Sequence, residues 1–329
     1  MFTTRYLKAT DKMNTASSNA ENIACLNCGN NTEIAQTGLF DTRFGIPAAY
    51  SIARCSVCGL EQTTPLASPE EIKSLYETYY NFGGENGTIY TRLRSLFLSS
   101  LLYQFWMILD GDISFHSKRG CGRLLDVGCN EGRGLAIYKK NGFSAEGLEL
   151  NENAANVARS LGFVVHTQLV ETFEPSERYD VVVLSNVLEH SLEPALMMTH
   201  VYRLLRPGGE VWISCPNSRS WLRSVFGRYW INWHVPFHIS HFSVETLRGL
   251  LREKGFTVVD AKQCTPALWV AHSIVSRFFA RSGKPTKQLR NPVLIMLLVG
   301  LIRGLFFSLP WLGNLMGRGD CLIVAASKK

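Results

Sequence analysis

The chain has 329 residues, of which 46% are hydrophobic, so it can bury a large core and fits one large domain with a small one beside it. The nine cysteines are not preceded by a charged and then apolar segment of the kind found in signal peptides. We therefore expect a reducing compartment, and not a secreted protein with disulfide bonds. The charge is uneven: residues 1–202 carry 16 basic against 22 acidic side chains, whereas residues 203–329 carry 18 against 5. The basic part either faces an anionic partner or keeps apolar helices in solution.

The N-terminal third divides into predicted segments. Residues 1–22 are polar and almost free of large apolar side chains, so we expect a disordered tail. Residues 23–65 hold two C-x-x-C-G motifs and are expected to form a small zinc-binding module. Residues 66–120 are expected to form a helical linker or lid before the large domain.

The two cysteine motifs, with 26 residues between them, predict a metal site. Each has a glycine after its second cysteine, which lets backbone amides turn toward the thiolates. Four thiolates suit tetrahedral zinc and leave no position for a water molecule, so we expect a structural ion. A redox site would need a single such motif leading into a helix. The expected ligands are Cys25, Cys28, Cys55 and Cys58.

A glycine-rich turn follows an apolar strand at residues 124–134, LLDVGCNEGRG. Glycines there let backbone N–H groups point at a ligand from a helix N-terminus. Glu149 ends the next strand, where a carboxylate can accept both hydroxyls of a ribose. Asp126 and Glu131 add negative charge, which would repel a pyrophosphate. The pattern therefore predicts a nucleoside-bearing cofactor with a cationic head.

This segment resembles motif I of class I S-adenosylmethionine-dependent methyltransferases, D-V-G-C-G-x-G, except that Asn130 replaces the middle glycine. Asparagine tolerates a positive φ, so we expect the turn to persist. Later runs are similar to the same enzymes and extend the resemblance over about residues 122–329. They are YDVVVLSNVLEH (179–190), a helix that begins near Pro194 and stops at 207–209, the strand EVWISCPN (210–217), a helix within 241–256 and a last strand within 317–329.

The resemblance implies an α/β fold, with a Rossmann-like class I methyltransferase sheet and helices on both faces at residues 121–329. The small zinc-ribbon-like module precedes it, and an apolar helical insertion interrupts it at about 264–316. The implied cofactor is S-adenosylmethionine. The residues expected to hold it are Asp126, Gly128, Cys129, Asn130, Gly132, Glu149, Leu150, Gln168, Leu169, Ser185 and Asn186.

Apolar segments occur at residues 95–109, 267–280 and 292–316. Arg303 and Pro310 interrupt the last one, so it lacks the uncharged run of about 18–20 residues that a transmembrane helix needs. We expect helices that pack on the core as a lid or homodimer face, or helices that lie in a membrane interface; a spanning helix is the third alternative. In a membrane interface, anionic lipid would meet Arg277, Arg281, Lys284, Lys287 and Arg290.

Methyl transfer to a hydroxyl needs a general base, and histidine has a suitable pKa. His190 follows a predicted strand in VLEH and is the expected base; the alternative is a structural histidine bonded to a backbone carbonyl. The spacing H-x3-H-x2-H in WHVPFHISHFS is compatible with acceptor binding, with structural hydrogen bonds or with a metal, although Pro236 breaks helical spacing. The residues expected to bind the acceptor are Glu189, His234, His238 and His241.

The sequence therefore predicts methyl transfer to a small-molecule acceptor, namely a sugar or polysaccharide-precursor hydroxyl on a nucleotide- or lipid-linked diphosphate. A cysteine module before this domain resembles bacterial sugar and polysaccharide-cluster methyltransferases. The alternatives are a zinc-ribbon RNA methyltransferase and a non-catalytic scaffold. Nucleic acid is disfavoured, because the half of the chain that holds the module is acidic and residues 185–188 read SNVL rather than N/D-P-P-Y/F. We expect a cytoplasmic enzyme, either free or peripheral at the membrane.

Overall fold

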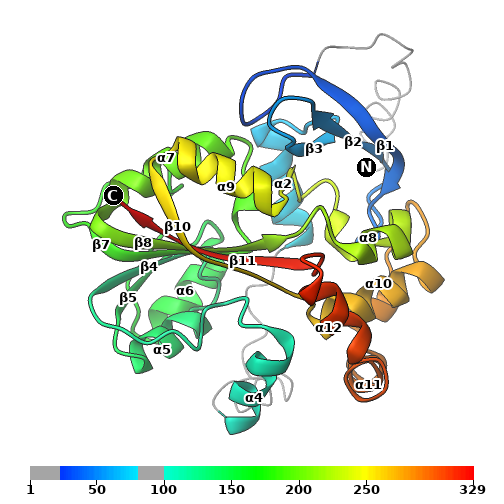
Figure 1. The fold of residues 1–329 in the computed structure, drawn as a ribbon. Helices are drawn as coiled ribbons and strands as arrows, with labels where there is room; N and C mark the ends of the chain where they lie inside the picture. Colours follow the sequence, from blue (N-terminus) through cyan, green and yellow to red (C-terminus); the bar gives the residue numbers. More distant parts are fainter. Residues whose placement is uncertain (1–22, 81–99) are drawn as a thin grey trace, which may run out of the picture.

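A computed structural model describes residues 23–80 and 100–329 of the chain. The tail predicted at residues 1–22 lies outside the described residues, as do residues 81–99 of the predicted linker. The described part contains a large central sheet with helices on both faces, a smaller N-terminal sheet and a group of helices beside them (Figure 1).

The central sheet has seven strands in the order β10-β11-β8-β7-β4-β5-β6. The run from β8 to β6 is parallel, whereas β11 is antiparallel to both of its neighbours. The central strands are apolar and buried on both faces, as parallel strands covered by helices must be. The strands are β4 (Arg123–Val127), β5 (Ser144–Leu148), β6 (Val165–His166), β7 (Tyr179–Ser185), β8 (Leu205–Pro216), β10 (Phe256–Cys264) and β11 (Cys321–Lys328).

Helices α5 (Arg133–Lys140) and α6 (Glu152–Ser160) cover one face of this sheet, and α7 (Pro194–Leu204) and α9 (Val244–Glu253) cover the other (Figure 1). Pro194 begins α7, as predicted. The strand predicted to begin at Glu210 begins five residues earlier, because Leu205 already pairs with Tyr179 of β7. The predicted α/β fold with helices on both faces is confirmed.

The N-terminal sheet joins the cysteine module to the large domain. Its order is β1-β2-β3-β9, and β9 (Ser240–His241) comes from the histidine-rich segment far along the chain. Glu61 of β3 pairs with His241, and its carboxylate binds the Arg223 guanidinium at 2.6 Å. The module therefore helps to hold the histidine-rich segment in place. The other strands are β1 (Thr32–Phe40), β2 (Ala49–Cys55) and β3 (Glu61–Thr64).

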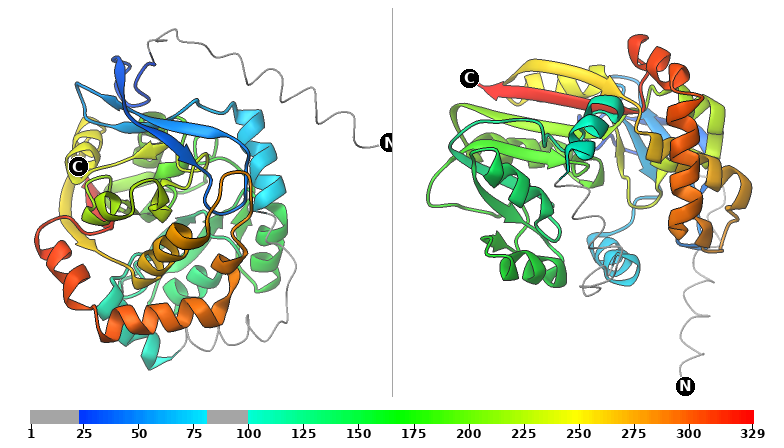
Figure 2. Two further views of the ribbon diagram at one scale, coloured as in Figure 1. Left: turned by 90° about the vertical axis from the view of Figure 1, so that its right-hand side faces the viewer. Right: turned by 90° about the horizontal axis from the view of Figure 1, so that it is seen from below.

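Three α-helices and the short η4 (Lys287–Arg290) lie between β10 and β11, where the apolar insertion was predicted. The α-helices are α10 (Ala267–Phe279), α11 (Pro292–Gly304) and α12 (Ser308–Leu315). Asp110, at the end of α4, forms an ion pair with Arg303 of α11 and accepts a hydrogen bond of 2.9 Å from the Ala267 amide. Both α4 and α11 project on the same side of the sheet (Figure 2). The remaining helices are α2 (Pro69–Tyr79), α4 (Leu101–Asp110), α8 (Trp221–Phe226) and the short η1 (Leu188–His190), η2 (Gly227–Tyr229) and η3 (Ile231–Trp233).

Within the described residues, no single helix has both the length and the apolar character needed to cross a bilayer. The consecutive helices α11 and α12 meet that requirement only together, and they are bent by 67° relative to each other.

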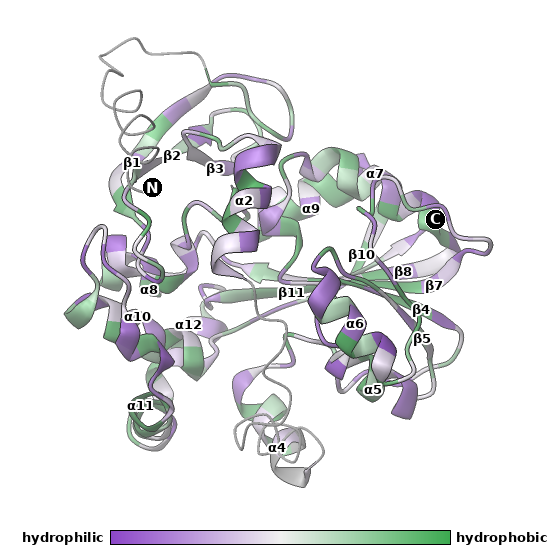
Figure 3. Cartoon of the chain, turned by 180° about the vertical axis from the view of Figure 1, so that it is seen from behind, coloured by the Kyte–Doolittle hydropathy of each residue, from purple (hydrophilic) through white to green (hydrophobic). Residues whose placement is uncertain are grey.

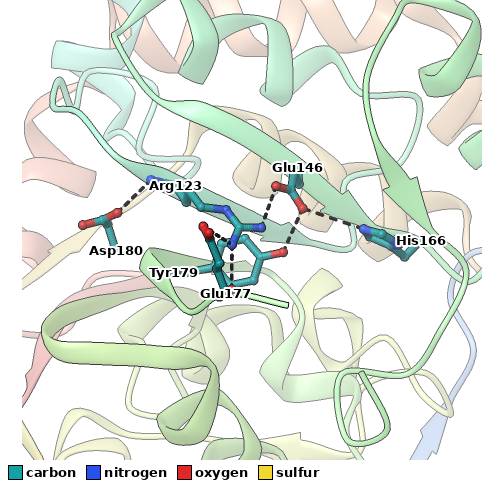
Figure 4. Close-up of polar contacts among 6 residues, drawn as sticks. All are labelled: Arg123, Glu146, His166, Glu177, Tyr179 and Asp180. Atoms are coloured by element: carbon teal, nitrogen blue, oxygen red, sulfur yellow. Dashed lines mark hydrogen bonds and ion pairs between the residues drawn. The ribbon is translucent and has the colours of Figure 1, made fainter. Parts of the chain in front are cut away.

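A cluster of polar side chains connects the parallel strands near the start of β4 and β7 (Figure 4). Arg123 binds Glu146 of β5 at 2.9 Å and the Glu177 carbonyl at 2.7 Å, and the Tyr179 hydroxyl donates to Glu146 at 2.9 Å. Burial raises the pKa of Glu146, but the hydrogen bonds from Arg123 and Tyr179 outweigh burial and hold that pKa below its usual value. The cluster is therefore structural, and it fixes the strands whose far ends carry the candidate site.

Candidate active site

The predicted cofactor turn lies between β4 and α5. Gly128 and Gly132 have φ values of +72° and +77°, and a Cβ on Gly132 would lie 2.7 Å from the Cβ of Ala158. Glycine is required there both for conformation and for space. Asn130 has a φ of +49°, so the prediction that asparagine would keep the turn is confirmed.

Glu149 lies directly after β5 and faces this turn. Its carboxylate accepts hydrogen bonds from the amides of Asn130 (2.9 Å) and Asn151 (2.8 Å). Because a carboxylate has about four acceptor sites, roughly two remain for ribose hydroxyls. Leu150, Gln168 and Leu169 are exposed on the loops after β5 and β6, and the Glu149 amide donates to the His166 carbonyl at 3.0 Å. These positions fit the predicted ribose and base side of a nucleoside.

The amide of Cys129 offers nothing further to a ligand, because it already donates to the Leu148 carbonyl at 3.1 Å. The Cys129 thiol is buried against Gly147. Ser185 donates to the Ile113 carbonyl at 3.0 Å, and Asn186 has a φ of +54° at the end of β7. Cys129 and Ser185 can therefore shape the cofactor site, but their hydrogen bonds are directed within the protein.

The electrostatics of the turn fit a cationic ligand. Glu131 binds Arg133 at 2.7 Å, so its charge is balanced within the protein. Asp126 is 7% exposed, and burial, followed by the negative charge of Glu149, raises its pKa to about 7. A positive ligand group would relieve this repulsion. The residues present thus fit S-adenosylmethionine, which supplies a methyl group activated by its sulfonium when bound.

The predicted acceptor residues gather near the carboxyl ends of β7 and β8. The ring centroid of His238 lies 4.7 Å from that of His190 and 4.8 Å from that of His234. Burial lowers the pKa of His190 to about 4, and the positive charge of Arg43 acts in the same direction. The ring of His190 is therefore neutral at physiological pH.

His241 does not join this group. It lies on β9, where its Nε2 is 3.0 Å from the Thr63 hydroxyl and its ring packs 5.3 Å from Trp233. Since the Thr63 hydroxyl donates to the His238 carbonyl at 2.6 Å, His241 must donate to Thr63. Its contacts are those of a residue that couples the N-terminal sheet to the histidine-rich segment.

The site includes residues that the sequence did not indicate. The Tyr76 hydroxyl lies 2.8 Å from His190 Nδ1, and the Tyr80 hydroxyl lies 2.8 Å from His234 Nε2. Both tyrosines lie at the C-terminal end of α2, four residues apart, a spacing that puts side chains on one helix face. This spacing was the available signal, but residues 66–120 were predicted only as a linker or lid.

Glu189 is 1% exposed, and neither of its carboxylate oxygens has a hydrogen-bond partner among the described residues. Burial raises its pKa to about 8, and its own backbone amide is the one group that acts in the other direction. A buried carboxyl group without a partner side chain needs an explanation. His190 and His238 each offer a ligand atom within 4.8 Å of one of its oxygens.

The four motif cysteines lie together, with their sulfur atoms all within 4.8 Å of one another. Sγ–Sγ distances are 3.5 Å for Cys25–Cys58 and for Cys28–Cys55. Tetrahedral zinc with bonds of about 2.3 Å places sulfur atoms about 3.8 Å apart, so the cluster is compatible with zinc. The Asn27 amide (3.4 Å) and the Asn30 side chain (3.3 Å) point at sulfur atoms, as thiolate ligands require.

Comparison with known proteins identifies the family of the large domain. Residues 97–261 match the family described as "Methyltransferase domain". The chain belongs to this family and is a class I S-adenosylmethionine-dependent methyltransferase.

Individual relatives match parts of the chain. The "Ubiquinone biosynthesis O-methyltransferase" of Salmonella arizonae is 31% identical over 124 residues, 35% of this chain and 51% of that protein. The chain thus spans about half the length of the curated relatives it matches. A SAM-dependent methyltransferase from Archaeoglobus fulgidus is 20% identical, with a TM-score of 0.45 over 73% of this chain and 100% of that one. The 1,6-didemethyltoxoflavin-N1-methyltransferase of Burkholderia thailandensis, solved with bound S-adenosylhomocysteine, is 17% identical, with a TM-score of 0.43 over 86% and 97%.

Proposed function

We propose that the enzyme methylates a hydroxyl group of a sugar or polysaccharide precursor, with His190 promoting loss of the hydroxyl proton. The observation that carries this proposal is the hydrogen bonding of His190. Its Nδ1 lies 2.9 Å from the Phe237 carbonyl, which can only accept, and 2.8 Å from the Tyr76 hydroxyl, which can accept as well. In the tautomer that donates from Nδ1 to these oxygens, Nε2 holds a free lone pair. The same carbonyl acts to raise the pKa of His190 and would stabilise the imidazolium.

The surroundings of His190 suit a polyhydroxylated ring. Tyr76, Tyr80 and His234 offer aromatic faces together with polar ring atoms, and the Tyr80 and Phe237 ring centroids are 4.9 Å apart. Arg43 adds a partly buried guanidinium, whose Nε has no partner among the described residues and whose charge acts on the site histidines. An anionic carrier would supply a partner for that charge.

The experiment is turnover of S-adenosylmethionine to S-adenosylhomocysteine with a panel of nucleotide-diphosphate sugars. We expect at least one sugar to be methylated on oxygen, and His190→Ala to lower turnover by about 10²–10⁴ at saturating cofactor. His200→Ala, a histidine on α7 outside the site, is the matched control and should keep full turnover. Unchanged turnover in His190→Ala would remove His190 from this role.

A second acceptor class is favoured by the exposed apolar helices. The curated relatives are named as O-methyltransferases of ubiquinone biosynthesis, and a phenol with a lipid tail would reach the site from a membrane surface. A panel with no sugar product but with a methylated lipid-linked phenol would favour this second class.

We propose further that α11 and α12 lie in the interface of an anionic membrane on the cytoplasmic side. Figure 3 shows α11 at one end of the molecule, away from the central sheet, and α12 between α11 and the end of that sheet. The loop that precedes them exposes Arg281, Lys284, Lys287 and Arg290. Exposed apolar side chains beside basic ones are typical of helices that bind anionic lipid. The apolar side chains, each at least 44% exposed, are Val293, Met296, Leu297, Leu301, Leu305, Phe306, Phe307, Leu309, Trp311, Leu312, Leu315 and Met316.

A homodimer is the alternative use of this surface, and the two predict different measurements. If the surface binds membrane, the protein should sediment with anionic liposomes and should be a monomer without lipid. If the surface is a dimer face, the protein should have twice the monomer mass without lipid. Arg303, which interrupts the apolar run, does not count toward the lipid contacts, because it pairs with buried Asp110.

We also propose that Cys25, Cys28, Cys55 and Cys58 hold one structural zinc ion. The N-terminal sheet is small, and a metal is a usual means of stabilising such a module. Because β3 pairs with β9, the ion would also support the position of the histidine-rich segment.

A further inference from the structure

We propose that Glu189, His190 and His238 form a second metal site, which binds a divalent transition-metal cation at the acceptor side of the active site. Each residue offers one ligand atom, and the three atoms lie within 4.8 Å of one another. Two imidazoles and one carboxylate are a recurrent ligand set for zinc, manganese, cobalt and iron, and they leave coordination positions open.

The carboxylate of Glu189 is the first support. It is buried, and both of its oxygens lack a partner among the described residues. An ionised carboxylate in that environment needs a compensating positive charge, and a cation on the histidines would supply it.

The tautomers of the two histidines are the second support. His238 Nδ1 is 2.8 Å from the Asn232 carbonyl, and His190 Nδ1 is 2.9 Å from the Phe237 carbonyl. A carbonyl only accepts, so His238 Nδ1 donates and its Nε2 carries a lone pair. His190 Nδ1 also lies 2.8 Å from the Tyr76 hydroxyl, and its Nε2 carries a lone pair in the tautomer in which Nδ1 donates. Histidines that ligate metals are usually held in this way, with the other ring nitrogen bonded to a backbone carbonyl or a carboxylate.

The backbone also fixes the three residues relative to one another. The Ile239 amide donates to the Glu189 carbonyl at 2.8 Å, and the Ile239 carbonyl accepts from the Thr63 amide at 2.9 Å. The segment with His238 is thus bonded to the short helix η1 on one side and to strand β3 on the other. Ligand atoms in tetrahedral geometry at about 2.1 Å from zinc are about 3.4 Å apart. The three atoms, within 4.8 Å of one another, would therefore have to approach by up to about 1.4 Å when the cation binds.

Hydroxyl activation by such a cation rests on the proposed methyl transfer to a hydroxyl and would replace His190 as the proton acceptor, whereas cation binding depends on neither. An acceptor hydroxyl on an open coordination position would lose its proton to water more readily, because the cation stabilises the alkoxide. His190 would then act as a ligand, since its Nε2 lone pair would be shared with the cation.

The experiment is a titration of the purified, zinc-containing protein with Co²⁺, followed by absorption spectroscopy without acceptor. Cobalt bound to nitrogen and oxygen ligands gives weak visible bands, whereas cobalt bound to thiolates adds intense sulfur-to-metal charge transfer in the near ultraviolet. We expect one equivalent with weak visible bands only. Glu189→Gln and His238→Ala should each weaken Co²⁺ binding by at least about 10–100-fold, which is the usual loss when even an outer-shell partner is removed.

His234→Gln is the matched control, because His234 packs against His238 but is not one of the three ligands. It should retain the weak visible bands. The proposal is overturned if wild-type protein that binds S-adenosylhomocysteine shows no weak visible bands in excess Co²⁺, or shows only thiolate charge transfer. It is also overturned if Glu189→Gln binds Co²⁺ as tightly as wild type. Because cofactor binding is measured separately, this failure differs from failure of the proposed methyl transfer.

Discussion

The affinity for S-adenosylmethionine should depend on pH through Asp126. This carboxyl group is 7% exposed, and burial together with the charge of Glu149 raises its pKa to about 7. A cationic ligand favours the ionised form, so binding should lower that pKa toward its ordinary value. Affinity should therefore be highest above pH 7 and should fall as the pH drops through 7.

The size of the change in affinity follows from the change in the pKa of Asp126 on cofactor binding. If the bound-state pKa is about 5 or lower, the dissociation constant at pH 6 should be about tenfold larger than at pH 8, which is about 1.4 kcal/mol. Asp126→Asn cannot ionise, so its affinity should be weaker at pH 8 and nearly constant over the same range. Asp260→Asn, on β10 outside the site, is the matched control and should keep the wild-type pH dependence.

Equilibrium dialysis with labelled S-adenosylhomocysteine, which retains the cationic amino group, measures this dependence without turnover. A wild-type dissociation constant that stays constant from pH 8 to pH 6 would refute the assignment of Asp126 to the cationic part of the cofactor. A constant that falls with decreasing pH would refute it as well.

Three further predictions concern other parts of the molecule. Glu149→Ala should weaken cofactor binding by roughly 1–3 kcal/mol, the usual cost of losing charge-assisted hydrogen bonds, and an unchanged constant in calorimetry would contradict its ribose role. Metal analysis should find about one zinc per chain, and Cys55→Ser should lose that zinc and unfold the N-terminal sheet while cofactor affinity stays nearly unchanged. Anionic liposomes should sediment the protein in a salt-dependent way. Changing the four basic residues before α11 to glutamine should reduce the free energy of liposome binding by up to about 4 kcal/mol. The control variant, Lys139→Gln with Lys140→Gln on α5, should bind liposomes as wild type does. The four basic residues are Arg281, Lys284, Lys287 and Arg290. If the protein stays in the supernatant at low salt, the apolar helices form core or dimer contacts instead.

Local features of this fold could be predicted from the sequence because local chemistry determines them. The turn at Gly128 and Gly132 requires positive φ, and Asn130 could be expected to tolerate it. The strand–helix alternation after it follows from apolar runs that stop at proline or glycine.

Long-range contacts could not be predicted in the same way. Strand β9 has two residues and no β pattern of its own, and it forms only because β3, far away in sequence, offers an edge. This pairing is what separates His241 from His238, although the sequence spacing suggested one group. Tyr76 and Tyr80 reach the site because of how α2 packs, and no short sequence motif indicates this packing.

Charged residues were the hardest to place. Arg303 interrupts an apolar run in the sequence, yet it is neutralised by Asp110 from another helix. Glu189 follows an ordinary polar strand end in the sequence, and only the three-dimensional structure shows that it is buried without a partner among the described residues. Burial of a charge depends on the residues that surround it, and these come from distant segments.

The central claim is that the turn after β4, together with Glu149, binds S-adenosylmethionine. Titration calorimetry of the folded wild-type protein with S-adenosylmethionine and with S-adenosylhomocysteine tests it most directly. The structure predicts that both ligands bind at one site per chain. The absence of heat with either ligand, at several temperatures and on protein shown to be folded, would contradict it.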